Sequence, residues 1–194
     1  VAAALAGCHG STTPPAAGGL TLHVALAAPP TDGDVAIASV ALHLSALRAV
    51  SDRSAVDARA AASDVDLALG DSVDVALPSA PPGLYSAVDA LLGSSADTGL
   101  ELQAVWNMAR IHATITTASF DVACATPVSL DPGHRARLDV QIDPASWFAA
   151  LDLAGATSDP DDAGIVISAD DNRPLELALL ANVTASFTLG CAPE

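Results

Sequence analysis

Apolar and polar side chains alternate along most of the chain after residue 19. Between residues 20 and 26 every second residue is Leu or Val, and Thr21, His23 and Ala25 lie between them. This period of two is typical of a strand with one buried face. The same criterion, or a short apolar run, predicts strands at 35–50, 65–69, 73–77, 84–92, 100–106, 110–116, 120–124, 128–130, 134–142, 165–167 and 184–190. Short strands separated by Pro/Gly turns predict an antiparallel β-sandwich of the immunoglobulin or transthyretin type.

Two segments near the C-terminus depart from this period. Asp143 and Pro144 are a cap and a first-turn proline, and they predict a short helix that carries Trp147, Phe148 and Leu151. A second helix is expected from 174 to about 182. No internal repeat interrupts the pattern, so 20–194 is predicted to form a single domain.

The N-terminal residues predict the cellular location of the protein rather than its fold. Leu5-Ala6-Gly7-Cys8 is an apolar run that ends in a cysteine after small residues, and it resembles a lipobox. Residues 1–8 are therefore interpreted as a signal-peptide remnant with lipidation at Cys8, and 9–19 as a flexible tether. This predicts an exported lipoprotein of the bacterial cell envelope, at the periplasm or the cell surface, with the membrane as its partner through the lipid.

Charge narrows the classes of partner. Seven basic residues, all of them arginine, stand against 23 acidic ones, which gives a formal net charge of -16. Nucleic-acid binding depends on cationic side chains, so this acidity argues against it and leaves cations or basic partners. Without lysine, the chain lacks a Schiff-base lysine and a phosphate-loop lysine. If Cys8 is acylated, Cys124 and Cys191 remain, and they predict a disulfide, the alternative being two buried thiols.

Three short segments carry a resemblance to a family. The loop at 81–85, the stretch at 143–148 and the stretch at 182–187 resemble, together with the lipobox, secreted bacterial lipoproteins with a β-sandwich domain of unassigned function. The resemblance implies the same architecture and supplies no catalytic residues. The main hypothesis is therefore a non-enzymatic binding or scaffolding protein, without a cofactor, whose partner is an unidentified protein or small ligand.

A metal-binding lipoprotein is the first alternative. If 106–116 were one continuous strand, one face would carry Trp106, Met108, Arg110 and His112. His43 lies on the polar face of its own strand. Imidazole and thioether ligands suit copper, so His43, His112 and Met108 form a candidate copper site. Some secreted bacterial β-sandwich proteins bind copper through histidines and a tryptophan-derived group. Their four-cysteine pattern is absent here.

Calcium is a second metal hypothesis. Asp159, Asp161, Asp162, Gly164 and Asp170 have the outline of a calcium loop, although an alanine occupies its fifth ligand position and an aspartate its twelfth. The competing interpretation is a solvated acidic loop.

A serine hydrolase is the remaining alternative. Gly70-Asp71-Ser72 resembles the nucleophile block of one serine-esterase family, in which Ser72 would attack and a histidine would act as base. Its place between two alternating strands favours an ordinary turn.

Overall fold

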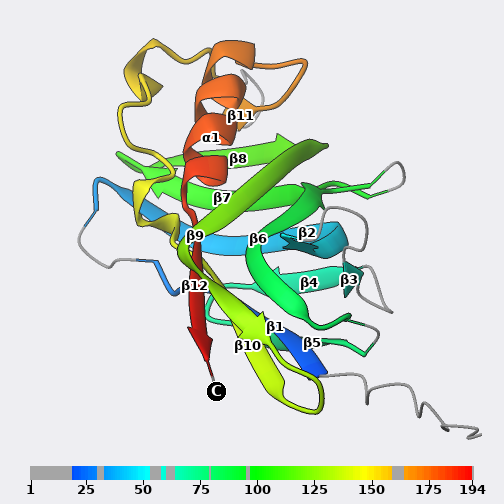
Figure 1. Ribbon diagram of the computed structural model, residues 1–194. Helices are drawn as coiled ribbons and strands as arrows, with labels where there is room; N and C mark the ends of the chain where they lie inside the picture. The colour runs from blue at the N-terminus through cyan, green and yellow to red at the C-terminus, as the bar shows by residue number, and fades with distance from the viewer. Residues whose placement is uncertain are drawn as a thin grey trace, which may run out of the picture.

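Two β-sheets packed face to face form the body of the protein (Figure 1). The computed structural model describes residues 19–29, 33–52, 58–59, 64–78, 80–94, 97–158 and 164–193. The small sheet has the order β12 (Phe187–Pro193), β10 (Arg135–Ile142), β1 (Gly19–Leu26), β5 (Ser72–Leu77). The large sheet has the order β11 (Ile165–Ile167), β8 (Ala109–Ile115), β7 (Leu100–Trp106), β2 (Val35–Ser51), β6 (Gly83–Leu92), β9 (Ala118–Leu130). Two further strands, β3 (Ala58–Arg59) and β4 (Val65–Ala68), also pair with β2.

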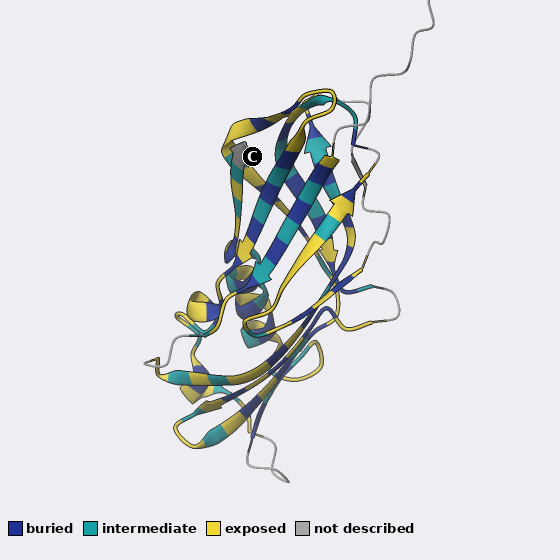
Figure 2. Cartoon of the chain, turned by 90° about the horizontal axis from the view of Figure 1, so that it is seen from below, coloured by how far each residue is buried: buried dark blue, intermediate teal, exposed yellow. Residues whose placement is uncertain are grey.

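The predicted mostly-β sandwich is confirmed, and the alternation of buried and exposed residues is plain in strands such as β1, β7 and β10 (Figure 2). Leu20, Leu22 and Val24 of β1 are at most 1% exposed, and the residues between them are partly exposed. Two pairings are not antiparallel: β1 runs parallel to β10, and β8 runs parallel to β11. Each parallel pair joins strands far apart in the sequence, as parallel pairing requires.

Strand β2 changes its buried face part-way along. Val40, Leu42 and Leu44 point into the core, as the alternation predicts, but after Ala46 the buried positions become Leu47 and Ala49. Ala46 has φ 53° and the register with β6 shifts at this point, so a β-bulge reverses the side-chain phase. The predicted strand at 35–50 is nevertheless present as one element, over Val35–Ser51.

Strands β7 and β6 pair with the same edge of β2, β7 along its first half and β6 along its second half. On the opposite edge of β2, β4 pairs with residues 41–44. The N–H of His43 donates to Gly99 O at 2.8 Å, and Gly93 N donates to His43 O at 2.9 Å. Residues 93–94 follow the end of β6, and residues 97–99 precede the start of β7. We call these described residues the excursion.

The predicted strands 120–124 and 128–130 are one strand, β9. Its pairing with β6 skips between Ala123 and Val128, so Pro127 lies where no ladder hydrogen bond is needed. Near the C-terminus, a 3-10 turn η1 (Pro144–Ser146) is capped by Asp143 as predicted, and a second turn η2 (Leu153–Gly155) follows.

One α-helix is present in the described residues, and it is longer than predicted. Helix α1 (Arg173–Ala185) packs against β8 and β11 at one end of the large sheet. Thr184 donates its hydroxyl to Leu180 O, which satisfies it within the helix, so the last strand begins at Phe187 rather than at 184.

Several expectations lie outside the described residues. These are the lipobox with Cys8, the tether up to residue 18, and the acidic residues Asp159, Asp161 and Asp162. None of the helices in the described residues combines the length and the apolar character needed to cross a bilayer.

Candidate functional site

The strongest candidate site is an acidic pocket of about 690 Å³ on the outer face of the large sheet. Five carboxylates line it, contributed by β4 and its flanks, by the excursion and by β7: Asp64, Asp66, Asp71, Asp97 and Glu101. The only titratable base among its described lining residues is His43. We call this the acidic pocket.

His43 sits at its floor because alternation directs it away from the core. Its neighbours Leu42 and Leu44 are at most 1% exposed on the inner face. Strand β4 pairs His43 directly with Asp66, and Nδ1 of His43 lies 2.7 Å from Asp66 Oδ1. A carboxylate only accepts hydrogen bonds, so Nδ1 carries the proton in this contact. The other ring nitrogen, Nε2, is buried and has no hydrogen-bond partner.

The excursion places Asp97 over this ring. Asp97 Oδ2 lies 4.0 Å from Nε2 of His43 and accepts a hydrogen bond from Ser94 Oγ at 2.9 Å. The base of the excursion is pinched: a Cβ on Gly93 would meet Thr116 O at 2.0 Å, and one on Gly99 would meet Gly93 N at 2.6 Å. Gly93 also has φ +80°, in the left-handed region. The packing at Gly93 and Gly99 and the hydrogen bond from Ser94 thus hold Asp97 in a defined position facing the pocket.

The carboxylates set the charge of His43. Its hydrogen bond to Asp66 raises the pKa of His43 above its ordinary value, and burial opposes the shift. The charges of Asp97 and Asp64 raise it further. The imidazolium is therefore favoured, which is the response expected of a base surrounded by carboxylates.

The predicted copper ligands do not converge. Met108 lies at the β7–β8 turn, with φ 67° and 95% exposure, because Asn107 and Met108 form a hairpin turn instead of continuing a strand. The turn also leaves Trp106 partly buried against the core and His112 on the outer face. The expectation of a shared face for Trp106, Met108 and His112 is therefore wrong.

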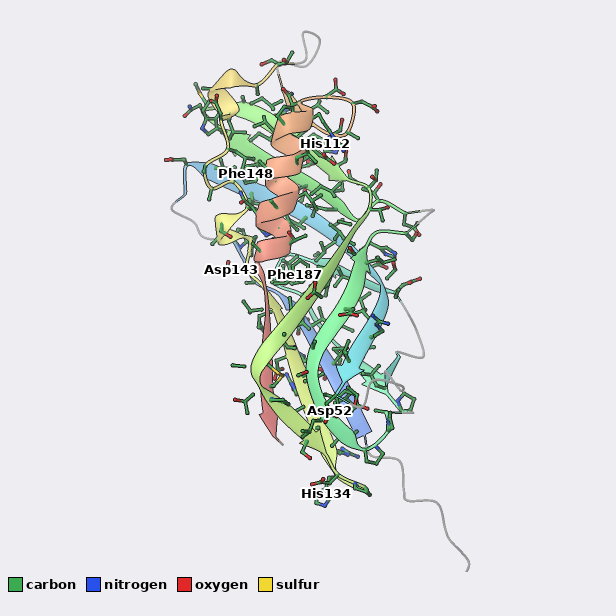
Figure 3. The ribbon with its side chains drawn as sticks, turned by 45° about the horizontal axis from the view of Figure 1, so that its top comes forward. Asp52, His112, His134, Asp143, Phe148 and Phe187 are labelled. Carbon is green, nitrogen blue, oxygen red and sulfur yellow. A yellow bond between two sulfur atoms is a disulfide. The ribbon has the colours of Figure 1, made fainter. Side chains whose placement is uncertain are left out.

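His112 is also far from His43. His43 lies opposite Gly99 and His112 opposite Gln103, on strands separated by β7. Four residues along a strand span about 13 Å and two strand spacings about 10 Å, so the backbones are roughly 16 Å apart. His112, which is labelled in Figure 3, instead lies with its Nε2 3.4 Å from Glu101 Oε1.

The remaining candidate residues are dispersed. His23 is on the small sheet, bonded to Asp74 at 2.7 Å. Ser72 begins β5 opposite Ala25 and makes no hydrogen bond to a histidine in the described part of the chain. Asp170 lies in the exposed turn before α1. Across the described ranges, no three His, Cys, Asp or Glu side chains form a group that could hold a metal ion.

The predicted disulfide is present. Cys124 on β9 and Cys191 on β12 are bonded, with their Cα atoms 6.0 Å apart, and the bond ties the large sheet to the small one.

The acidic side chains around His43 were not singled out from the sequence. Asp66 falls on the polar face of the predicted strand at 65–69 and Asp64 directly precedes it, a weak signal in so acidic a chain. A stronger signal was available in 93–99, where two glycines bracket a short polar segment between alternating runs. Which strand lies beside His43 depends on the pairing of β4 with β2, which local sequence does not encode.

Comparison with known proteins shows the fold and no family. No family model matches the chain, and no curated protein matches it. Among solved structures, MbnP from Methylosinus trichosporium is similar with a TM-score of 0.55 over 90% of this chain and 98% of that one. The sequences are 12% identical, so the likeness concerns the fold alone.

Proposed function

We propose that this chain is a non-enzymatic binding protein of the cell envelope that takes a small organic cation into the acidic pocket. The observation that carries the proposal is the excess of carboxylates there, five against one imidazole, in a hollow of about 690 Å³. Such a volume exceeds the needs of a bare ion and falls in the range of small-molecule sites. A net charge of -16 also attracts cations to the surface.

Putrescine is a suitable probe, with 1,4-butanediol as the uncharged control. Calorimetric titration should detect putrescine and not the diol. Asp97→Asn should weaken putrescine binding about fivefold, the effect of about 1 kcal/mol for one partly exposed ion pair. Asp121→Asn, on the exposed face of β9 and away from the pocket, should leave the affinity unchanged. Equal binding of putrescine by both variants would contradict the assignment of the pocket.

A transition-metal ion is a second candidate ligand, and one specific contact favours it. A metal-binding histidine characteristically donates one ring N–H to a carboxylate and presents the other nitrogen to the metal. His43 has this arrangement: Nδ1 bonds Asp66, Nε2 is buried without a partner, and Asp97 lies 4.0 Å beyond it. His43 and Asp97 would be the protein's ligands, with the remaining positions left to water or a second ligand.

One variant distinguishes the organic cation from the transition-metal ion as the ligand of the pocket. His43→Gln removes the nitrogen ligand, so it should abolish binding of Cu²⁺ or Zn²⁺ and leave putrescine bound. His112→Gln should affect neither, because His112 lies far from the floor of the pocket. Metal binding that survives His43→Gln and fails in His112→Gln would overturn the metal assignment.

A further inference from the structure

Two alanines form part of the floor of the acidic pocket, beside His43. Ala41 of β2 and Ala68 of β4 are directly paired, are exposed on the outer face and line the hollow. Their side chains end at Cβ, so the space that a larger residue would fill stays open at this position. The pocket therefore has an apolar patch of floor among its carboxylates.

Carboxylates flank this patch on both sides. Ala41 pairs with Ala68 on one edge of β2 and with Glu101 of β7 on the other edge (Figure 1). On the β4 side, Asp66 shares the outer face with Ala68, and Asp71 accepts a hydrogen bond from Ala68 N at 2.9 Å. On the β7 side, Glu101 itself lines the pocket. The negative charge is thus divided between two sides that β2 separates.

The spacing of the strands decides what kind of cation can use both sides. Neighbouring strands lie about 4.8 Å apart, so the backbones of β4 and β7 are about 10 Å apart across β2. An ammonium group bonds a carboxylate at about 2.8 Å, so a single ammonium satisfies one side and leaves the other without a cation. Two ammonium groups joined by a short aliphatic chain can satisfy both sides, with the methylenes over the alanines.

The carboxylates keep acceptor capacity for such a ligand. Asp66 uses Oδ1 for His43, and Asp71 uses Oδ2 for a backbone N–H. Glu101 has Oε1 at 3.4 Å from His112, and its side chain is 54% exposed. A carboxylate offers about four lone-pair sites on two oxygens, so each of the three can accept a further hydrogen bond.

We infer that the acidic pocket binds a linear aliphatic diamine, whose two ammonium groups bind the carboxylates of the β4 side and of the β7 side and whose methylene chain lies over Ala41 and Ala68. The inference rests on the proposed function, because it specifies which class of organic cation the pocket takes. It adds that a cation with a single charge fills half of the site.

Two amines of equal length test whether the ligand spans β2. Putrescine and n-pentylamine differ in that a methyl group of pentylamine replaces the second ammonium. Calorimetric titration of the full chain, with a chelator present, should find putrescine bound about fivefold more tightly, the effect of one partly exposed ion pair. At about 150 mM salt the Debye length is about 8 Å, so the overall charge of -16 contributes little to this preference.

Isosteric variants locate the two ammonium groups. Glu101→Gln and, separately, Asp71→Asn each remove a charge and keep an acceptor oxygen. One of them should weaken putrescine about fivefold and leave n-pentylamine unchanged, because the monoamine leaves that side empty, and the other should weaken both amines. Asp121→Asn, on the exposed face of β9, should change neither. An equal loss of both amines in both pocket variants, or no loss of putrescine in either, would overturn the inference.

A larger side chain on the floor tests the position of the methylene chain. Ala41→Leu should weaken putrescine about fivefold or more, because the added atoms occupy the space above β2. Ala38→Leu is the matched control, since Ala38 is also exposed on β2 but lines a different hollow, and it should leave the affinity unchanged. Circular dichroism checks that both variants are folded. Wild-type affinity in Ala41→Leu would overturn the placement of the chain over the alanines.

The outcomes separate this inference from the proposed function. Equal affinities for putrescine and n-pentylamine, with Asp97→Asn still weakening putrescine, would overturn the diamine inference and leave the cation-binding pocket standing. Binding of neither amine would overturn the proposed function together with this inference.

Discussion

Nε2 of His43 and Oδ2 of Asp97 face each other across 4.0 Å, a separation too long for a hydrogen bond and short enough for one bridging atom. The contact exists because the excursion lies between the end of β6 and the start of β7, which pair one after the other with the same edge of β2. The base of the excursion is constrained because neither Gly93 nor Gly99 has room for a Cβ. This constraint holds the Asp97 carboxylate in position over the buried Nε2 of His43.

The His43–Asp66 pair should make stability depend on pH. Because the folded-state pKa of His43 is raised, the pair contributes fully below the ordinary pKa of histidine, and the contribution is lost as pH rises through the folded value. Denaturant unfolding should show that His43→Gln costs more at pH 5.5 than at pH 8.5, by about 0.5–1 kcal/mol for a partly exposed pair. In an Asp66→Asn background the pH-dependent part should become smaller, because only the charges of Asp97 and Asp64 then raise the pKa of His43. A cost independent of pH in the wild type would contradict the pair.

Protonation of His43 should weaken putrescine binding, whereas it strengthens the His43–Asp66 pair. Putrescine competes with the imidazolium for Asp64, Asp66, Asp71, Asp97 and Glu101, which face His43 from β4, its flanks, the excursion and β7. One unit charge at about 6 Å in water costs about 0.7 kcal/mol, a factor of about three. Calorimetry should therefore find putrescine bound about threefold more tightly at pH 8.5 than at pH 6, and His43→Gln should flatten the difference. Tighter binding at pH 6 would contradict the assignment.

The excursion should be intolerant of side chains at its base. Gly93→Ala would push a Cβ to 2.0 Å from Thr116 O, so the backbone must shift, at a cost of about 3 kcal/mol or more. Gly70→Ala is the matched control: Gly70 also has positive φ, at +81°, but open space around it, and should cost only about 1 kcal/mol. Denaturation curves measure both. Equal costs would show that the backbone around Gly93 is not packed as tightly as described.

The sequence predicted the strands well because alternation is a local property. The inner faces of β1 and β7 follow directly from it, and so does the position of His43 on an outer face. What it missed depends on tertiary pairing. The reversal of side-chain phase at Ala46 needs a positive φ, which an alanine in the sequence does not signal. The hairpin at Asn107 and Met108 divides the segment that was expected to carry copper ligands on one face into two strands.

The disulfide should contribute substantially to stability. Cys124 and Cys191 close a loop with a sequence separation of 67, for which the chain-entropy estimate is about 4 kcal/mol. Reductant should therefore lower the thermal midpoint of the wild type and leave that of a Cys124→Ser/Cys191→Ser double variant unchanged. An unaffected wild-type midpoint would mean that the bond does not constrain the unfolded chain as expected.

Membrane attachment should depend on a single thiol. The lipobox interpretation makes Cys8 the acylated residue, since the thiol carries the lipid and acyl chains supply the anchoring energy at about 0.8 kcal/mol per buried methylene. Cys8→Ser, in a protein expressed with an export signal, should move the protein from the membrane fraction to the soluble fraction of the envelope. Ser11→Ala, in the same segment, is the control and should remain with the membrane. If the Cys8→Ser protein still sediments with membranes, another part of the chain provides the anchor, and the lipoprotein proposal fails while the pocket around His43 is unaffected.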